Sequence, residues 1–510
     1  MHKTDNFPSL RKLNGRRVLF VDGKPFIMLG LQWDCDWCYS PYEMEPYFEQ
    51  AKKMCLNTVS LLLYWKEVEP EKDVYDFAYL DRRIELARKY GLKIILVWFA
   101  SFKNAGITYA PDYIRRDHET YRKVQKKDGS LVPCCCCPTA ENTHARDEKA
   151  LIKVFEHIKE IDSQEHTVIL FQMENETGIQ RTDRCYCPIC SERYEKEGWE
   201  EKYGWRASEA FTAGMIAEYC DSLTKTVKEI YPLSVYVNAA LPFLWANSVA
   251  GDDWHGRRPG HFNGGPVGRV LDVWHNAIKY IDFISPDIYQ PSYHDFRHFC
   301  KEYTWKEQPL FIPECATGKG ARVEKNVIYA IGEFGAIGID PWSITRSCPD
   351  FMGESLINPS DMRWSCQAYE LRQSYKMVKD VMYPLAMAQN TDRLKFFVQE
   401  EGDFGIKLQF GEIGAEMRYE HPEDKARGFV IKLAEDEYLI SGAGVHIQFS
   451  KYTGELVPIR SVEIGHYDDD KWICHYEYTR EDPLDTQGFA LRDCMTARVT
   501  LGRRIDWEAI

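Results

Sequence analysis

Eight short apolar runs alternate with amphipathic stretches between about residues 26 and 344, and this alternation constrains the fold more than any other feature. The runs resemble buried strands, whereas the stretches between them carry apolar residues at three- and four-residue intervals, as helices do. Eight strand–helix units of parallel type predict an α/β protein with a (β/α)8 TIM barrel. The expected strands are Phe26–Leu31, Thr58–Tyr64, Lys93–Phe99, Val168–Glu174, Ser234–Asn238, Phe283–Ile288, Leu310–Glu314 and Gly335–Ile339.

The pattern changes near residue 385, which divides the chain into two expected domains. At 510 residues the chain is too long for one ordinary core. Asp361–Val381 has the pattern of a last barrel helix, and after Met382-Tyr-Pro384 come short β-rich runs separated by Gly, Asp and Pro. We therefore expect a barrel over residues 1–385 and a smaller C-terminal β-sandwich over residues 390–510.

Carboxylates follow two of the expected strands. The run that ends at Phe171 continues as Gln-Met-Glu-Asn-Glu-Thr-Gly178, and Leu310-Phe-Ile-Pro313 is followed by Glu314. Cleavage of a glycosidic bond with retention needs one carboxyl that protonates the leaving oxygen and a second that attacks the anomeric carbon. Strands four and seven lie across the barrel mouth from each other, so we assign Glu176 as acid/base and Glu314 as nucleophile.

Glu174 competes with Glu176 for the acid/base role, because residues i and i+2 of a strand share a face. Its expected position is deeper, where a charge needs a partner, and we rank it second. Both acids could also be ordinary solvated loop residues, but two strand-end acids across one predicted barrel favour the catalytic interpretation.

A second motif, Cys185-Tyr-Cys-Pro-Ile-Cys190, places three thiols at a spacing that lets them converge on one ion. Structural zinc takes four ligands in a tetrahedron. We expect the fourth from Cys134–Cys137; Cys137 is our candidate, although the sequence does not choose among the four. A disulfide or an accidental thiol cluster is the alternative. Four thiolates leave no position for water, so the predicted zinc is structural.

Charge and cysteine content narrow the classes of partner and compartment. Lys and Arg number 64 against 78 Asp and Glu, a net charge of −14, which disfavours nucleic acid or an anionic membrane as partner. No apolar run approaches a membrane span, and the first residues are polar. The 17 cysteines are irregularly spaced, so we expect a reducing cytoplasm and a metal site instead of a disulfide framework.

Further polar and aromatic residues follow the first strands, where barrel sites form. Trp33 and Trp65 could offer apolar faces to a sugar ring, and Asn104 and Asn238 could bond its hydroxyls. The alternative for each is packing of the barrel rim.

The segment Phe171–Gly178 resembles the Asn-Glu acid/base motif of β-galactosidases in glycoside hydrolase family 35. The thiol motif behind it is similar to the zinc cluster of family 42 β-galactosidases, and Val74-Tyr-Asp-Phe77 matches an opening that both families share. Together with the β-rich tail, these features resemble a β-galactosidase-like group of clan A related to both. The strand-seven context Ile312–Ala316 departs from both families.

This resemblance implies a retaining exo-acting β-galactosidase that removes terminal galactose from an oligosaccharide. It implies that Asn175 bonds the sugar 2-hydroxyl, that Tyr289 orients the nucleophile, and that Trp342 forms the platform under the sugar. A homo-oligomer is expected by resemblance alone.

Three other functions remain open at this point. A β-glucoside, β-fucoside or α-L-arabinoside could replace the galactoside, because one hydroxyl orientation decides the sugar. A carbohydrate-binding barrel without turnover is a second possibility. A thiol or metal enzyme is a third.

Overall fold

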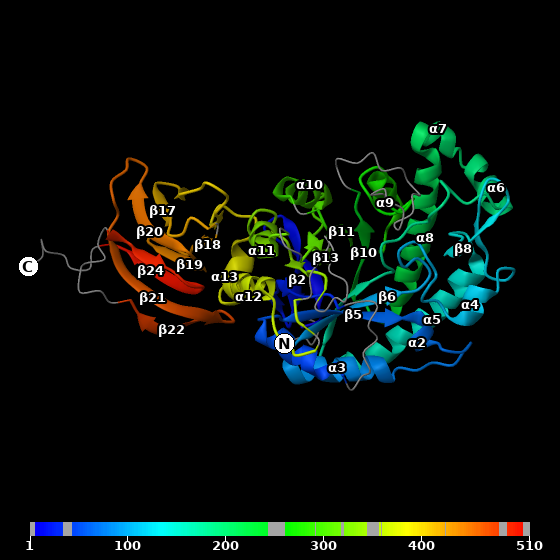
Figure 1. Cartoon of the computed structure of the whole chain (residues 1–510), viewed down its shortest axis with the longest axis horizontal. Coiled ribbons are helices and arrows are strands. Elements are labelled where there is room, and N and C mark those ends of the chain that lie inside the picture. Colours follow the sequence, from blue (N-terminus) through cyan, green and yellow to red (C-terminus); the bar gives the residue numbers. More distant parts are fainter. Residues whose placement is uncertain are drawn as a thin grey trace, which may run out of the picture.

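The structure, a computed structural model of the chain, shows an α/β body joined to a β-rich C-terminal body (Figure 1). It describes residues 6–33, 43–242, 261–290, 292–317, 321–343, 356–358, 360–423, 425–478 and 487–502.

Parallel strands form the centre of the α/β body. Six of them make one curled sheet in the order β13-β11-β10-β9-β6-β5, and three make a second sheet in the order β12-β14-β4. Every pairing within both sheets is parallel. The strands are β4 (Met28–Leu29), β5 (Thr58–Tyr64), β6 (Lys93–Phe99), β9 (Val168–Gln172), β10 (Ser234–Ala240), β11 (Phe283–Ile288), β12 (Phe311–Ile312), β13 (Glu314–Cys315) and β14 (Gly338–Ile339).

These nine strands fall on the eight predicted runs, because Pro313 divides one run into β12 and β13. Proline lacks the backbone N–H that a continuous ladder requires. The run therefore pairs with β14 through β12 and with β11 through β13. At the other edges, the Trp33 N–H donates to the Ser60 carbonyl at 3.2 Å, and the Ser60 N–H donates to the Leu31 carbonyl at 3.1 Å.

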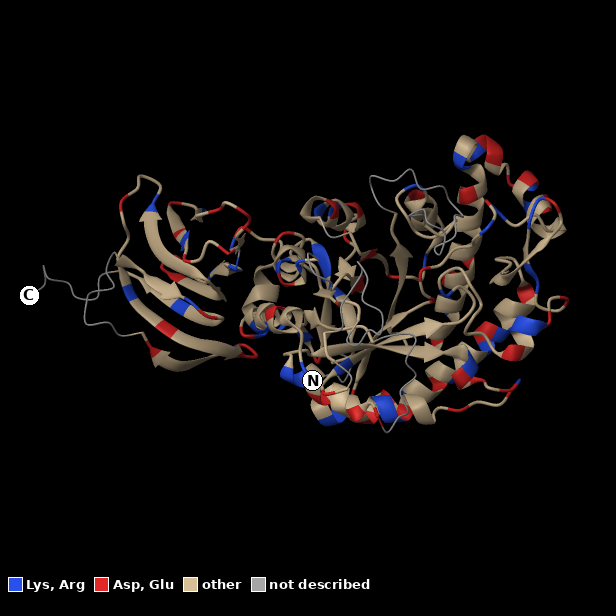
Figure 2. Ribbon diagram, viewed as in Figure 1, with Lys and Arg blue, Asp and Glu red and all other residues tan. Residues whose placement is uncertain are grey.

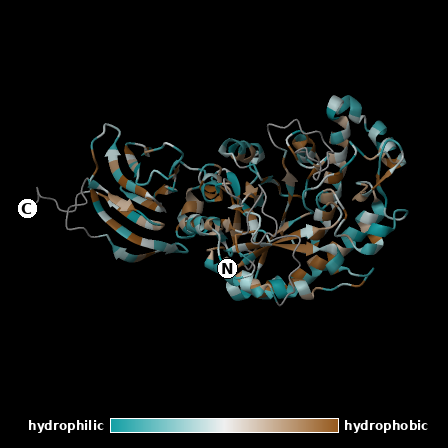
Figure 3. Cartoon of the chain, in the orientation of Figure 1, coloured by the Kyte–Doolittle hydropathy of each residue, from teal (hydrophilic) through white to brown (hydrophobic). Residues whose placement is uncertain are grey.

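The strands are almost continuously apolar, since β5 and β10 are buried along their whole length. Figures 2 and 3 show that charged residues lie mainly on the outer helices and hydrophobic residues mainly on the strands. The helices are α1 (Glu45–Lys53), α2 (Trp65–Val68), α3 (Ala78–Tyr90), α4 (Asp112–Arg116), α5 (Glu141–Asp162), α6 (Pro188–Lys196), α7 (Trp199–Tyr203), η1 (Gly204–Arg206), α8 (Ala207–Ile230), α9 (Leu271–Ala277), α10 (Tyr293–Tyr303), α11 (Val323–Gly332), α12 (Cys366–Lys379) and α13 (Met382–Ala388). Within the described part of the chain, every helix is too short or too polar to cross a membrane.

An antiparallel sheet that the sequence did not predict precedes the parallel strands. It consists of β1 (Ser9–Leu13), β2 (Arg16–Val21) and β3 (Lys24–Pro25). Val18 and Val21 of β2 share a buried cluster with side chains of the parallel strands, including Ile95 and Phe283. Arg17 Nη2 also donates to the Asp282 carbonyl, just before β11, at 2.7 Å. The sheet therefore covers the amino ends of the strands, opposite the ends that carry the predicted site.

The C-terminal region is β-rich, as the sequence indicated. Two antiparallel sheets, ordered β15-β18-β19-β24-β21-β22 and β16-β17-β20-β23, contribute to one hydrophobic cluster. The boundary near residue 385 stays a prediction. The strands are β15 (Leu394–Val398), β16 (Gly405–Phe410), β17 (Ile413–Tyr419), β18 (Arg427–Lys432), β19 (Glu437–Ala443), β20 (Val445–Lys451), β21 (Ile459–Asp468), β22 (Lys471–Glu477), β23 (Phe489–Leu491) and β24 (Met495–Leu501).

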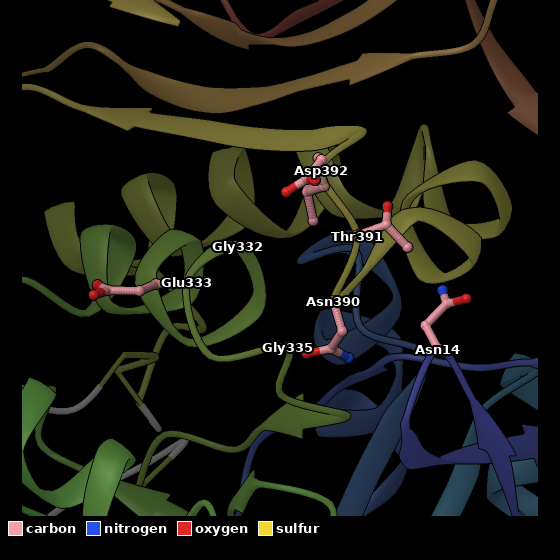
Figure 4. A pocket seen from close by; sticks show the side chains of 8 residues that line it. Asn14, Gly332, Glu333, Gly335, Asn390, Thr391 and Asp392 are labelled. Carbon is pink, nitrogen blue, oxygen red and sulfur yellow. The ribbon is translucent and has the colours of Figure 1, made fainter. Parts of the chain in front are cut away.

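The two bodies are in direct contact. Arg427 Nε of β18 donates to Ser374 Oγ of α12 at 2.8 Å, and Ser441 Oγ of β19 donates to the Met377 carbonyl at 2.9 Å. An open cleft of about 620 Å³ lies at this junction (Figure 4). It is lined by Asn14, Gly332, Glu333, Gly335, Asn390, Thr391, Asp392 and Leu394, and it includes none of the predicted site residues.

Candidate active site and thiol cluster

The two predicted catalytic carboxylates meet at the carboxyl ends of the parallel strands. Glu176 lies four residues beyond β9, and Glu314 begins β13. One carboxylate oxygen from each of them, together with one from Asp287 of β11, lies within 4.8 Å of the others. Glu176 and Glu314 are only 4% and 5% exposed. The structure thus brings two buried carboxyl groups close together, although their residues lie 138 positions apart in the sequence.

Glu314 is held by two hydrogen-bond donors. The Tyr289 hydroxyl donates to Oε2 at 2.6 Å, and Gln32 Nε2 donates to Oε1 at 2.8 Å. Burial raises the pKa of Glu314, while both donors lower it because they stabilise the charged form. Each oxygen therefore has a donor that favours the ionised carboxylate.

Glu176 is surrounded by amide side chains and lies near the Glu314 carboxylate. Asn104 Nδ2 donates to Glu176 Oε2 at 2.7 Å, and the Glu176 N–H donates to Asn238 Oδ1 at 2.8 Å. Burial, followed by the charge of Glu314, raises the pKa of Glu176 to about 8. This difference between two neighbouring carboxyls, one supported in its ionised form and one held protonated at neutral pH, suits a nucleophile and an acid.

An amide network connects the side chains around Glu176. Asn175 Oδ1 accepts from Gln172 Nε2 at 2.9 Å and from Asn238 Nδ2 at 3.1 Å. Asn175 Nδ2 donates to Asn104 Oδ1 at 3.0 Å. The structure therefore brings the predicted Asn175, Asn104 and Asn238 together beside Glu176.

Asp287 is a third buried carboxylate that the sequence analysis missed. It pairs with Glu314 in the parallel register, and its Oδ2 accepts from Asn238 Nδ2 at 2.7 Å. Burial and the charges of Glu314 and Glu176 raise its pKa well above the usual value. The signal was present: Asp287 precedes the predicted Tyr289 by two residues, so both lie on one face of the end of β11. Gln32 was missed in the same way, one residue before Trp33.

Glu174 does not lie with the catalytic pair. Its carboxylate is fully buried and accepts backbone N–H groups of Ser101 and Phe102, at 2.9 and 3.0 Å. Both Glu174 and Glu176 have positive φ, 61° and 46°, so the backbone does not continue as the regular strand that would align them. The Glu174 carboxyl group therefore contacts the loop at residues 101–102 and does not take part in the Glu176–Glu314 pair.

The three predicted tryptophans occupy different environments. Trp342 is partly exposed, and its ring meets the Tyr289 ring edge-on with centroids 6.1 Å apart. Trp65 is instead 0% exposed and donates from Nε1 to Glu69 Oε2 at 2.9 Å. Trp33 packs against Phe48 in the same hydrophobic cluster, with ring centroids 4.9 Å apart. Trp33 and Trp65 therefore lie in the hydrophobic cluster of the α/β body, and their role as sugar contacts stays a prediction.

Four thiols converge beside the loop that follows Glu176. The Sγ atoms of Cys137, Cys185, Cys187 and Cys190 all lie within 4.8 Å of one another and are buried. Cys137 Sγ is 3.6 Å from that of Cys185, 3.9 Å from that of Cys187 and 3.7 Å from that of Cys190. These separations exceed a disulfide bond of about 2.05 Å, and each of these four cysteines is a free thiol.

Among the four adjacent cysteines, the side chains of Cys135 and Cys136 point away from the thiol cluster, whereas that of Cys137 points into it. It follows the hairpin of β7 (Lys123–Gln125) and β8 (Leu131–Cys136). Cys135 Sγ donates to the Ala105 carbonyl, and Cys136 Sγ donates to the carbonyl of Cys137. Of the four adjacent cysteines, the structure thus places the Cys137 thiol beside the three thiols of the motif.

Two family models match parts of this chain. The glycoside hydrolase family 42 model, described as beta-galactosidase, matches residues 39–233, which include Glu176 and the four thiols. A model described as a domain of unknown function (DUF5597) matches residues 371–476. Over residues 39–233 the chain is therefore similar to the β-galactosidase-like glycoside hydrolases.

Individual relatives cover part of the chain. Beta-galactosidase BgaH of Haloferax lucentense is 26% identical over 139 residues, 26% of this chain and 19% of that protein. Beta-galactosidase Bga of Halorubrum lacusprofundi is 28% identical over 149 residues, 28% of this chain and 19% of that protein. The matched stretch thus spans about a fifth of these relatives.

The fold comparison extends further. The crystal structure of beta-galactosidase from Bacillus circulans sp. alkalophilus superposes with a TM-score of 0.53 at 14% identity, covering 70% of this chain and 56% of that one. At this identity the likeness concerns the fold. It agrees with the parallel strands of the α/β body, at whose carboxyl ends Glu176 and Glu314 lie.

Proposed function

We propose that the chain is a retaining glycosidase that releases terminal galactose from β-galactosides. The observation that carries this proposal is the pair of buried carboxylates whose oxygens approach within 4.8 Å. Retaining enzymes hold their carboxyl groups about 5–5.5 Å apart, whereas inverting enzymes separate them by about 6.5–9.5 Å to admit a water. The approach of one oxygen of Glu176 to one oxygen of Glu314 is nearer to the retaining separation than to the inverting one.

The roles follow from the surroundings of each carboxyl. Glu314, with donors on both oxygens, attacks the anomeric carbon while Glu176 gives its proton to the leaving oxygen, and the glycosidic C–O bond breaks. Glu176, now ionised, then removes a proton from water. That water attacks the anomeric carbon, the bond to Glu314 breaks, and Glu176 is protonated again.

Binding of the sugar is assigned to residues around this pair. The Asn175 amide, held by Gln172 and Asn238, is positioned to bond a hydroxyl next to the reacting carbon. Trp342, beside Tyr289, offers an apolar face to the sugar ring. Galactose is proposed because the matched relatives are named beta-galactosidases.

We further propose that the two parallel sheets close into one eight-stranded barrel and that the C-terminal sheets form a β-sandwich. The backbone bonds between Leu31, Trp33 and Ser60, and the division of one run at Pro313, support closure at both edges. The shared hydrophobic cluster of the two antiparallel sheets supports the sandwich.

The thiol cluster is proposed to bind a structural zinc ion. Four thiolates at about 2.3 Å from a tetrahedral zinc lie about 3.8 Å from one another, close to the separations of 3.6–3.9 Å around Cys137. Bound zinc would join the hairpin before Cys137 to the loop after Glu176. The backbone contact from the Tyr186 N–H to the Gln125 carbonyl, at 2.8 Å, joins the same segments. Such a thiolate site suits the proposed cytoplasmic location, because reducing conditions preserve thiols.

The test is hydrolysis of a panel of p-nitrophenyl glycosides by wild type, Glu176→Ala and Glu314→Gln, with the exposed Glu401→Gln as control. We expect the β-galactoside to be cleaved, both active-site variants to lose activity, and Glu401→Gln to retain it. NMR of the first product should show the β-anomer. Preference for another sugar would change the substrate, release of the α-anomer would refute retention, and inactivity on every glycoside would refute the function. Metal analysis should find one zinc per chain.

A further inference from the structure

Glu174 is a buried carboxylate that the proposed reaction does not use. It lies two residues before the acid/base, and its oxygens accept three consecutive backbone N–H groups. The donors are Ala100 at 3.3 Å, Ser101 at 2.9 Å and Phe102 at 3.0 Å. Three convergent N–H groups make a specific anchor for this carboxyl group, because together they fix the positions of both of its oxygens.

The anchored loop carries a residue that contacts the acid/base. Asn104 follows two positions after Phe102, and its N–H donates to the Asn175 carbonyl at 2.9 Å. Its side chain donates to Glu176 Oε2. Asn104 and Ala105 both have positive φ, 50° and 58°, a conformation that costs energy for residues other than glycine. Such a turn needs support from its surroundings. Glu174 provides this support through its hydrogen bonds to residues 100–102, which precede the turn.

A second buried carboxylate extends the anchor away from the site. Asp147 of α5 accepts from Trp98 Nε1 and Ser101 Oγ, each at 2.9 Å, and from the Tyr219 hydroxyl at 2.9 Å. Ser101 therefore joins the two carboxyls, with its N–H on Glu174 and its hydroxyl on Asp147. Within the described ranges, no Lys or Arg forms an ion pair with either carboxyl. Uncharged N–H and O–H groups therefore hold both Glu174 and Asp147.

We propose that Glu174 is a positioning residue for acid/base catalysis: by holding residues 100–102 it keeps Asn104 on Glu176. The proposal rests on the proposed function and adds a role that Glu174 performs through the loop. Asn104 determines where Glu176 Oε2 lies, and so where the proton of that carboxyl is directed. Loss of the anchor would leave Glu314 and its donors in place while misaligning the acid.

Leaving-group dependence separates this role from a general structural one. A dinitrophenolate departs without protonation, whereas the alcohol of a disaccharide needs the acid. Glu174→Gln places an NH2 group against backbone donors. We expect kcat/KM on the preferred disaccharide to fall about 100-fold, within the range of general acid catalysis, and kcat/KM on the dinitrophenyl glycoside to change by less than about threefold.

Two further variants sharpen the test. Asn104→Ala should produce the same selective loss, and Glu174→Gln combined with Asn104→Ala should add little to it, because both changes interrupt one connection. Ser101→Ala is the matched control: it keeps the N–H that binds Glu174 and removes the hydroxyl, so the ratio between the two substrates should stay near that of the wild type. If Glu174→Gln is insoluble, Glu174→Asp keeps the carboxyl group, shortens its reach by one methylene and should show the same selectivity.

The outcomes are distinguishable. Wild-type activity with an equal loss on both substrates, or with additive effects in the double variant, would overturn the positioning role and leave the proposed function standing. A wild type inactive on every glycoside would overturn both. A selective loss in Glu174→Gln that Asn104→Ala reproduces would support the proposal.

Discussion

Replacement of Glu176 by Gln tests the protonation state of the acid/base without any substrate. In the folded chain the pKa of Glu176 is raised to about 8, first by burial and then by the charge of Glu314. In the unfolded chain the same carboxyl ionises near its ordinary pKa of 4.5. Because the folded state holds the proton more tightly, stability is lost as pH rises from the lower pKa to the higher one. Gln does not ionise and is free of this loss.

The magnitude follows from the two pKa values. At about 1.36 kcal/mol per pKa unit, the full effect approaches about 5 kcal/mol, of which about 4 kcal/mol develops between pH 5 and pH 8.5. An unfolding entropy of roughly 2.1 cal/mol/K per residue over this chain converts that energy to about 4 °C in Tm.

The assay is thermal unfolding of wild type and Glu176→Gln across this pH range at one scan rate. The Tm of the variant relative to wild type should rise with pH and level off above about pH 8. The exposed Glu401→Gln serves as control and should follow the wild type throughout. A constant difference between Glu176→Gln and wild type, or one that falls with pH, would refute the assignment of a raised pKa to Glu176.

Three other predictions follow from the site. Tyr289→Phe removes a donor that holds the pKa of Glu314 down, so the acidic limb of kcat/KM should move to higher pH and the maximum should fall about 10- to 100-fold; an unmoved limb would contradict this role. Cys187→Ser should lose the zinc found in wild type and lower Tm, whereas Cys136→Ser should keep it; metal analysis that finds equal zinc in both would exclude the proposed ligand set. Trp342→Ala should raise KM about 10-fold through lost stacking, with a smaller effect on kcat; an unchanged KM would remove Trp342 from the binding site.

Much of the strand pattern could be predicted because parallel strands are buried on both faces. Three predicted runs, Thr58–Tyr64, Lys93–Phe99 and Phe283–Ile288, have the observed bounds of β5, β6 and β11. The N-terminal sheet was missed, since β1 and β2 are short and partly exposed and the apolar run of β2 covers only residues 18–21. This sheet could be recognised only from its contacts with the amino ends of the parallel strands, which lie far away in the sequence.

The functional residues divide in a similar way. Glu176, Glu314 and the three-thiol motif were identified because reactive side chains at strand ends, and ligands at metal spacing, are visible in local sequence. Gln32 and Asp287 were missed, although each lies one or two residues from a predicted site residue. Their roles depend on which neighbour each side chain meets across the strands.

By itself the sequence determined the alternation of strands and helices, the two catalytic candidates and the convergent thiols, because each is a local pattern of polarity or spacing. Tertiary structure decided the remaining assignments. It turned Glu174 under a loop while Glu176 entered the site, it buried Trp65, and it selected Cys137 from four adjacent cysteines. Adjacent residues have similar positions along the chain but point in different directions once the backbone turns. Direction, and with it burial and hydrogen-bond partners, is settled when distant segments pack together.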